Sequence, residues 1–88
     1  MTNLTGMHLR AARALLRWRM QDLAGKARVG VPLLKRAELL DGPVNMTEGD
    51  RNAILKVLEM AGVTLIDDPE NGTGATLRRR PRTDGMIG

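Results

Sequence analysis

The sequence predicts an all-α fold, a small bundle of four to five helices, with a C-terminal β-hairpin as a possible extension. Its 88 residues suffice for one small domain rather than two. The apolar content of 42% is ordinary for a folded protein, but the aromatic content is 1%, because Trp18 is the only aromatic residue. A core of Leu, Ala, Val, Ile and Met suits packed helices better than sheets. Apolar residues also recur at helical spacing in several segments before Gly62.

The first helix is predicted in the segment MHLRAARALLRWRM, residues 7–20. Leu9, Ala12 and Leu16 recur at helical spacing and form one apolar face. The Thr-Gly pair before the segment suits the N-cap of this helix. We expect Trp18 to wedge between this helix and the next one as part of the core.

A second and a third helix are predicted at about residues 20–27 (MQDLAGKA) and 31–39 (VPLLKRAEL). Residues 28–30 form a tight connection between them. Gly30 is an acceptable N-cap for the third helix. Pro32 is tolerated in the first turn, because its missing N–H would have no partner within the helix.

The fourth helix follows a break at residues 41–43 (DGP) and is the clearest of the chain. It is predicted to start at Thr47, which with Asp50 resembles a capping box, and to stop at Gly62. The pattern then changes, and VTLIDD and ATLRRR flank the turn cluster PENGTG. We therefore divide the chain into a helical domain (1–62), a β-hairpin (63–79) and a basic, disordered tail (80–88).

Charge points to an anionic partner, most often nucleic acid. The formal net charge is +4 and the pI is about 10.7. Residues 1–36 are strongly basic, with Asp22 as their only acid, whereas residues 37–70 are mainly acidic. No apolar run is long enough to cross a membrane, and the N-terminus lacks a signal-peptide pattern. We expect a cytoplasmic protein.

Catalysis and metal binding are not expected, and no catalytic residue, cofactor or metal site is assigned. The chain has no Cys and no Ser, so the usual nucleophiles and thiolate zinc ligands are missing. Asp67 and Asp68 are adjacent and would point to opposite faces of a strand, which makes a poor acid/base pair. His8 is the only histidine, and we expect it to face solvent.

The order of these segments resembles the Cro/C1-type (XRE-like) helix-turn-helix regulators, whose fold is lambda-repressor-like. The matching stretches are LRAARALLRW, QDLA, KA with Val29, and KRAE followed by DGP, and EMAGVTLIDD resembles the end of small members. The resemblance covers about residues 7–70. It implies a helix-turn-helix DNA-binding domain in which the second helix crosses the DNA backbone and the third enters the major groove. It also implies a structural ion pair between Arg13 and Glu38.

The sequence departs from the family pattern on the expected DNA face. Arg19 stands where a Ser or Thr usually caps the second helix, and Met20 stands where a Gln usually contacts DNA. Arg28 occupies a turn position that often holds Gly; a positive φ there would cost on the order of 1 kcal/mol. The third helix opens with Val31 and Pro32, which can press on a thymine methyl but cannot form bidentate hydrogen bonds to a base.

We therefore expect a bacterial or phage transcriptional regulator, nucleoid-associated and dimeric, with strong phosphate contacts and weak base readout. Arg36 is the residue suited to guanine, and a second subunit, another regulator or RNA polymerase would supply further specificity. The alternatives are a protein-interaction module on the same scaffold (an antitoxin, an anti-repressor or a polymerase-binding factor) and a non-specific architectural DNA-binding protein. The DNA-binding candidates are Arg17, Arg19, Gln21, Arg28, Val31, Pro32, Lys35, Arg36, Asn45, Arg78, Arg79 and Arg80.

Overall fold

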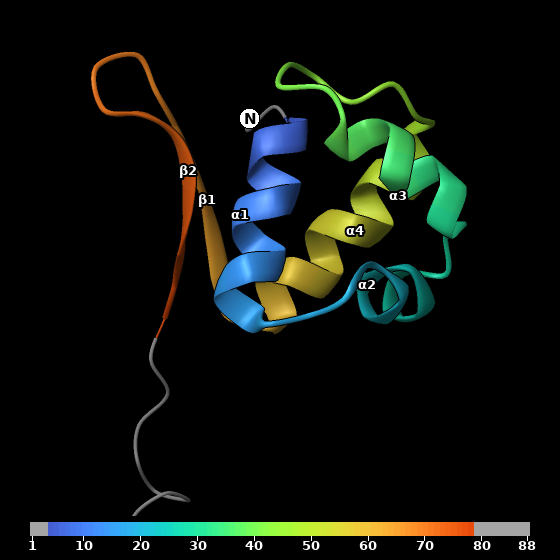
Figure 1. Cartoon of the computed structure of the whole chain (residues 1–88). Helices are drawn as coiled ribbons and strands as arrows, with labels where there is room; N and C mark the ends of the chain where they lie inside the picture. The colour runs from blue at the N-terminus through green and yellow to red at the C-terminus, as the bar shows by residue number, and fades with distance from the viewer. Residues whose placement is uncertain (1–3, 79–88) are drawn as a thin grey trace, which may run out of the picture.

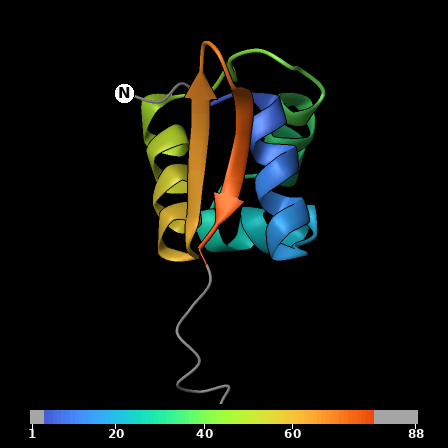
Figure 2. The same cartoon turned by 90° about the vertical axis from the view of Figure 1, so that its left-hand side faces the viewer.

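The computed structural model describes residues 4–78, in which the helices gather on one side of a β-hairpin (Figure 1). The elements follow in the order α1 (Gly6–Leu16), α2 (Met20–Ala27), α3 (Val31–Glu38), α4 (Glu48–Met60), β1 (Val63–Asp68) and β2 (Gly72–Leu77). The hairpin runs lengthwise along α1 and α4 (Figure 2), and α2 and α3 lie on the far side of the molecule from it. No helix in this part of the chain is long and apolar enough to span a membrane.

The predicted all-α class is wrong, because the described chain combines four helices with a two-stranded antiparallel sheet. The strands pair from Val63 opposite Leu77 to Asp68 opposite Gly72. Val63 is buried, and Leu65 and Ala75 pack against the helical core. The hairpin therefore covers part of the core, which is the physical reason that a bundle of helices alone does not describe this fold. The predicted tail (80–88) lies outside the described residues.

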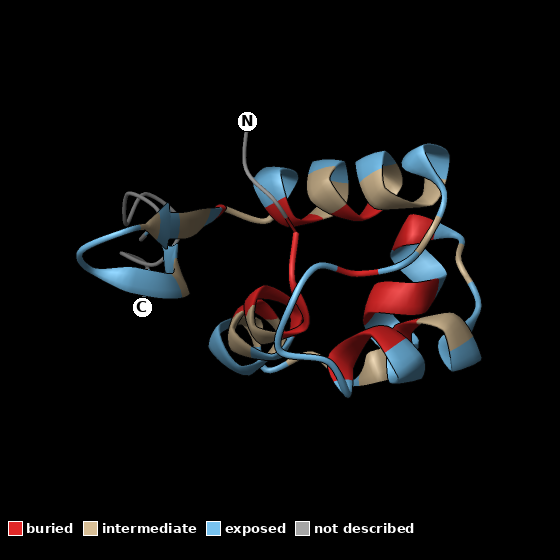
Figure 3. Ribbon diagram, turned by 90° about the horizontal axis from the view of Figure 1, so that it is seen from above, coloured by how far each residue is buried: buried red, intermediate tan, exposed pale blue. Residues whose placement is uncertain are grey.

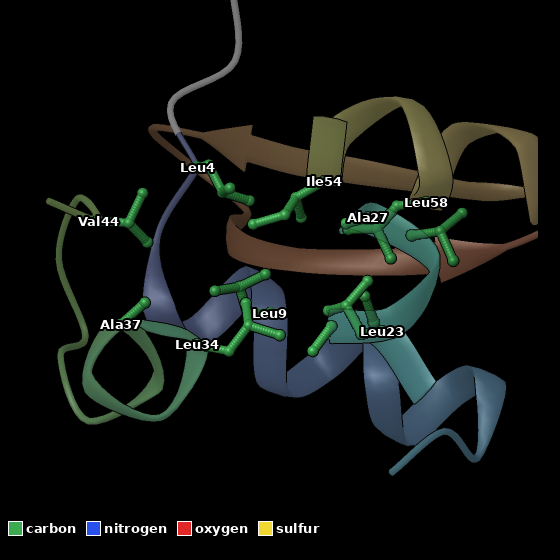
Figure 4. Close-up of a cluster of buried hydrophobic side chains, with 12 residues drawn as sticks. Leu4, Leu9, Leu23, Ala27, Leu34, Ala37, Val44, Ile54 and Leu58 are labelled. Carbon is green, nitrogen blue, oxygen red and sulfur yellow. The ribbon is translucent and has the colours of Figure 1, made fainter. Parts of the chain in front are cut away.

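One hydrophobic core joins all four helices (Figures 3 and 4). Its largest fully buried apolar side chains come from each helix and from the segment before α1: Leu4, Leu9, Leu23, Leu34, Ile54 and Leu58. Burying one such side chain contributes about 1.5–3 kcal/mol. Val44 closes the core from the loop after α3, where its N–H donates to the carbonyl of Leu4 at 3.0 Å. The apolar spacing of the sequence thus builds a core that positions α2 and α3.

His8 is fully buried, so the expectation that it faces solvent is wrong. Thr5 is the N-cap of α1, and its hydroxyl accepts the N–H of His8 at 3.1 Å. In return the Nδ1 atom of His8 accepts the N–H of Thr5 at 3.0 Å, which completes a capping box with His in the place of the usual Glu or Gln. The other ring nitrogen, Nε2, is then free to donate to the carbonyl of Ile66 at 2.7 Å. One side chain therefore caps α1 and ties the hairpin to it.

Candidate nucleic-acid interface

Two short helices, α2 and α3, are joined by residues 28–30 in a helix-turn-helix arrangement. Arg28 ends α2 in the left-handed region at φ 58° and ψ 44°, and the N–H of Val29 then donates to the carbonyl of Ala24 at 3.0 Å. Because Arg28 carries a Cβ, this conformation costs on the order of 1 kcal/mol compared with Gly. Arg17, the C-cap of α1, has the same φ of 58°, although no turn pattern in the sequence indicates a left-handed residue there.

An ion pair between the half-buried Arg13 and the buried Glu38 fixes α3 against α1. The guanidinium of Arg13 donates two hydrogen bonds to the carboxylate of Glu38, from Nε to Oε2 at 2.6 Å and from Nη2 to Oε1 at 2.7 Å. Its third nitrogen donates to the carbonyl of Trp18 at 3.0 Å, in the connection to α2. Hydrogen bonding to Glu38 raises the pKa of Arg13, although burial acts in the opposite direction. The family resemblance implies a contact between these two side chains, and the structure has it. The contact holds α3 and the connection to α2 against α1.

A second ion pair between α1 and the end of α3 is exposed. Arg10 contacts Asp41 at 2.6 Å and also donates to the backbone carbonyls of Glu38 and Leu40. These two pairs are the only ion pairs found within residues 4–78. The remaining Arg and Lys side chains in this range therefore have no carboxylate within bonding distance in the same range.

Cations with no carboxylate partner within residues 4–78 surround α2 and α3. All five members of the group, which we call the basic face, are exposed: Arg17, Arg19, Arg28, Lys35 and Arg36. They come from the end of α1, the start of α2, the turn and the exposed side of α3. Positive side chains without internal partners are free to meet an external anion such as the phosphate backbone.

The start of α2 accounts for two departures from the family pattern. The side chain of Arg19 makes no capping hydrogen bond, and the carboxylate of Asp22 accepts the Arg19 N–H at 2.8 Å instead. Met20 is half-buried and packs against the core. Gln21 is exposed beside it and retains a side chain that can donate a hydrogen bond.

Trp18 is half-buried and packs on the core. The ammonium of Lys26 lies 5.3 Å from the centroid of its ring.

The exposed side of α3 is both basic and apolar. Val31 and Pro32 are exposed in its first turn, and Lys35 and Arg36 follow one turn later. Arg36 and Asn45 line a shallow depression of about 330 Å³, whose other walls are Leu33, Ala37, Leu39 and Leu40. The structure thus places Asn45 and Arg36 on the wall of the same depression, although nine positions separate them in the sequence.

Leu39 and Leu40 form an apolar surface that sequence reasoning missed. Leu39 is 76% exposed, because α3 ends at Glu38 and the chain then turns toward the loop that holds Val44. One sequence feature indicates this exposure. The helix-breaking stretch DGP directly follows Leu40, so α3 ends before these leucines can pack along a helix face.

Arg78 does not join the basic face. It directly follows β2, which lies on the other side of the molecule from α3 (Figure 1). Its N–H donates to the carbonyl of Gly62 at 2.8 Å, at the foot of the hairpin. Arg79 and Arg80, the predicted DNA contacts that follow Arg78, lie outside the described residues.

Comparison of the chain with protein-family models, curated proteins and solved structures found no match in any of the three. Its function is therefore inferred from the arrangement of its own side chains.

Proposed function

We propose that this chain is a DNA-binding transcriptional regulator of the Cro/C1-type (XRE-like) helix-turn-helix kind, encoded by a bacterium or phage and acting on double-stranded DNA in the bacterial nucleoid. The observation that carries the proposal is the basic face, five exposed cations on and around α2 and α3 that have no carboxylate partner within residues 4–78. A duplex presents closely spaced phosphates that such a surface neutralises with release of counterions.

In the proposed complex α3 enters the major groove and α2 lies against the backbone. Arg36 reads guanine through its forked donors, because it is exposed on α3. Lys35 meets a phosphate, and Val31 and Pro32 press on thymine methyl groups. This arrangement gives strong, salt-sensitive binding with modest base readout.

The test is selection from sheared genomic DNA at near-physiological salt, followed by affinity measurements on the enriched site. Arg36→Glu should abolish binding to that site, whereas Lys56→Glu, which makes the same charge change on an exposed part of α4, should weaken it far less. Lys35→Ala should lower the slope of log affinity against log salt by about 1, as the loss of one phosphate contact predicts. Equal effects of the two Glu substitutions, or no retained DNA at all, would contradict the proposal.

The exposed leucines after α3 favour one second candidate, a protein-interaction module on the same scaffold. Leu39 is 76% exposed and Leu40 is 46% exposed, and both directly follow the last residue of α3. An antitoxin, an anti-repressor or a factor that binds RNA polymerase would dock on such a surface. In that case Leu39→Asp abolishes binding to the protein partner, whereas Arg28→Glu, a charge reversal in the turn between α2 and α3 and outside this depression, leaves it intact.

A further inference from the structure

A second depression lies at the lower end of the molecule in Figure 1, where α2 meets the C-terminal ends of α1 and α4 (Figures 1 and 2). Its volume of about 530 Å³ is typical of a site for a small molecule. Six residues line it: Leu16, Trp18, Lys26, Val57, Met60 and Ala61. No member of the basic face is among them, so a ligand in this depression would not depend on contact with DNA.

The walls of this depression are mostly apolar and are held in place. Leu16, Trp18 and Val57 are half-buried and pack on the core. The backbone of Trp18 is fixed, because its carbonyl accepts a hydrogen bond from the side chain of Arg13 and its N–H donates to the carbonyl of Arg13, each at 3.0 Å. Met60 is 73% exposed, and its unbranched side chain can adjust to a ligand. The walls therefore suit an apolar chain or ring.

Lys26 is the only charged residue of the six. Its ammonium lies 5.3 Å from the centroid of the Trp18 ring, and no carboxylate within residues 4–78 pairs with it. A lysine ammonium has three donors and no acceptor, so it recognises an anion. The cation–π contact holds the ammonium at the depression before a ligand arrives, which lowers the entropy cost of binding. The charged group that fits beside these apolar walls is therefore negative.

The small extent of the lining and its single charge define the class of occupant. A protein interface engages about 20–30 residues on each side, far more than the six found here. One ammonium balances one negative charge, whereas a phosphate is better matched by the forked donors of arginine. A molecule with an apolar chain or ring and one carboxylate meets both conditions.

We propose that this depression binds a small apolar carboxylate. The apolar part of the ligand lies against Leu16, Trp18 and Val57 and is removed from water there. The carboxylate accepts a charge-assisted hydrogen bond from the ammonium of Lys26, and such bonds are stronger than those between neutral groups.

The first test is calorimetric titration of the full chain with octanoate at neutral pH, with octylamine as the matched ligand of opposite charge. We expect saturable binding of octanoate with a dissociation constant of about 1 mM or lower. Octylamine should bind at least about tenfold more weakly, because its cation meets Lys26. The chain has one Trp, so its single indole signal in NMR should shift with octanoate, together with amides of residues 57–61. No binding of octanoate, equal affinity for the two ligands, or shifts centred elsewhere would overturn the proposal.

Substitution of Lys26 tests the charge. Lys26→Met removes the ammonium but keeps an unbranched side chain, and it should weaken octanoate binding at least about tenfold and abolish the preference over octylamine. Lys56→Met makes the same change at an exposed position of α4 that does not line the depression, so it should leave both affinities unchanged. Equal effects of the two substitutions would contradict the assignment of Lys26.

A change at Met60 tests the site independently of Lys26. Met60→Asp adds a carboxylate to the lining, and the exposure of Met60 leaves the core intact. Octanoate should bind more weakly to this variant and octylamine more tightly, because the added charge repels one ligand and attracts the other. If both affinities fall, or neither changes, the ligand does not occupy this depression.

Discussion

Removing the guanidinium of Arg13 should destabilise the fold far more than breaking the neighbouring exposed ion pair. The side chain of Glu38 is 7% exposed and takes two of its hydrogen bonds from Arg13. Arg13→Ala leaves that carboxylate buried without a counter-charge and also removes the bond to the carbonyl of Trp18. Breaking one partner of a buried pair costs about 3–5 kcal/mol. A domain of this length has a total stability of about 4–13 kcal/mol, so the variant should be close to unfolding.

Asp41→Ala provides the matched control, because it breaks the other ion pair between α1 and the end of α3. The side chain of Asp41 is 78% exposed, and exposed pairs contribute about 0.2–1 kcal/mol. Urea unfolding followed by circular dichroism gives the free energy of unfolding of each variant. Equal losses for Arg13→Ala and Asp41→Ala would refute the reasoning from burial.

A double replacement distinguishes the cost of an orphaned charge from the loss of the contact itself. Arg13→Met combined with Glu38→Leu removes both charges and fills the same space with apolar side chains. Replacing both members of a buried pair is often neutral or stabilising, so the double variant should recover most of the stability lost in Arg13→Ala. If it is as unstable as the single variant, the carboxylate of Glu38 is not the source of the cost.

Three further outcomes are expected. Gly6→Ala should destabilise the protein by about 1–3 kcal/mol or more in urea unfolding, despite the better helix propensity of Ala, because the added Cβ would overlap the carbonyl of Leu40. His8→Gln should retain the α1 cap but lose the link to Ile66, so hydrogen exchange should accelerate in the hairpin while the helices stay protected. Backbone hydrogen bonds from the hairpin turn lower the pKa of Asp68 below its ordinary 3.8. Its contribution to the turn is therefore present above that value and lost as the pH falls further below it; Asp68→Asn should abolish this acid dependence of the turn amide signals in NMR.

The helices were accessible from sequence because their signals are local. Leu9 and Ala12 recur at helical spacing, Thr47 accepts the N–H of Asp50 at 3.1 Å at the start of α4, and Gly62 follows its end with a positive φ of 95°. The strain at Arg28 was foreseen because a turn position that often holds Gly carries an Arg here. These features depend on residues within one or two turns of each other.

The errors arise where distant residues decide the outcome. The all-α prediction rested in part on the scarcity of aromatic residues. It is wrong because Val63 and Leu65 pack against the helical core, which makes the hairpin part of that core. His8 carries no local sign that its ring will meet Ile66. In the candidate site, the exposure of Leu39 depends on where α3 ends and where the loop then runs. The contact between Arg13 and Glu38 was anticipated only through the family resemblance, since periodicity places neither residue opposite the other.

The bond from His8 to Ile66 also constrains the order of events during synthesis. It spans 58 positions, so the N-terminal helix is made long before its partner strand leaves the ribosome. Until then the imidazole and the apolar side of α1 face water or a chaperone. Contacts between residues far apart in the sequence form late, and they make folding slower. Docking of the hairpin against the helices should therefore be among the last steps of folding. A nascent chain stopped before Ile66 would therefore hold helices without a finished core.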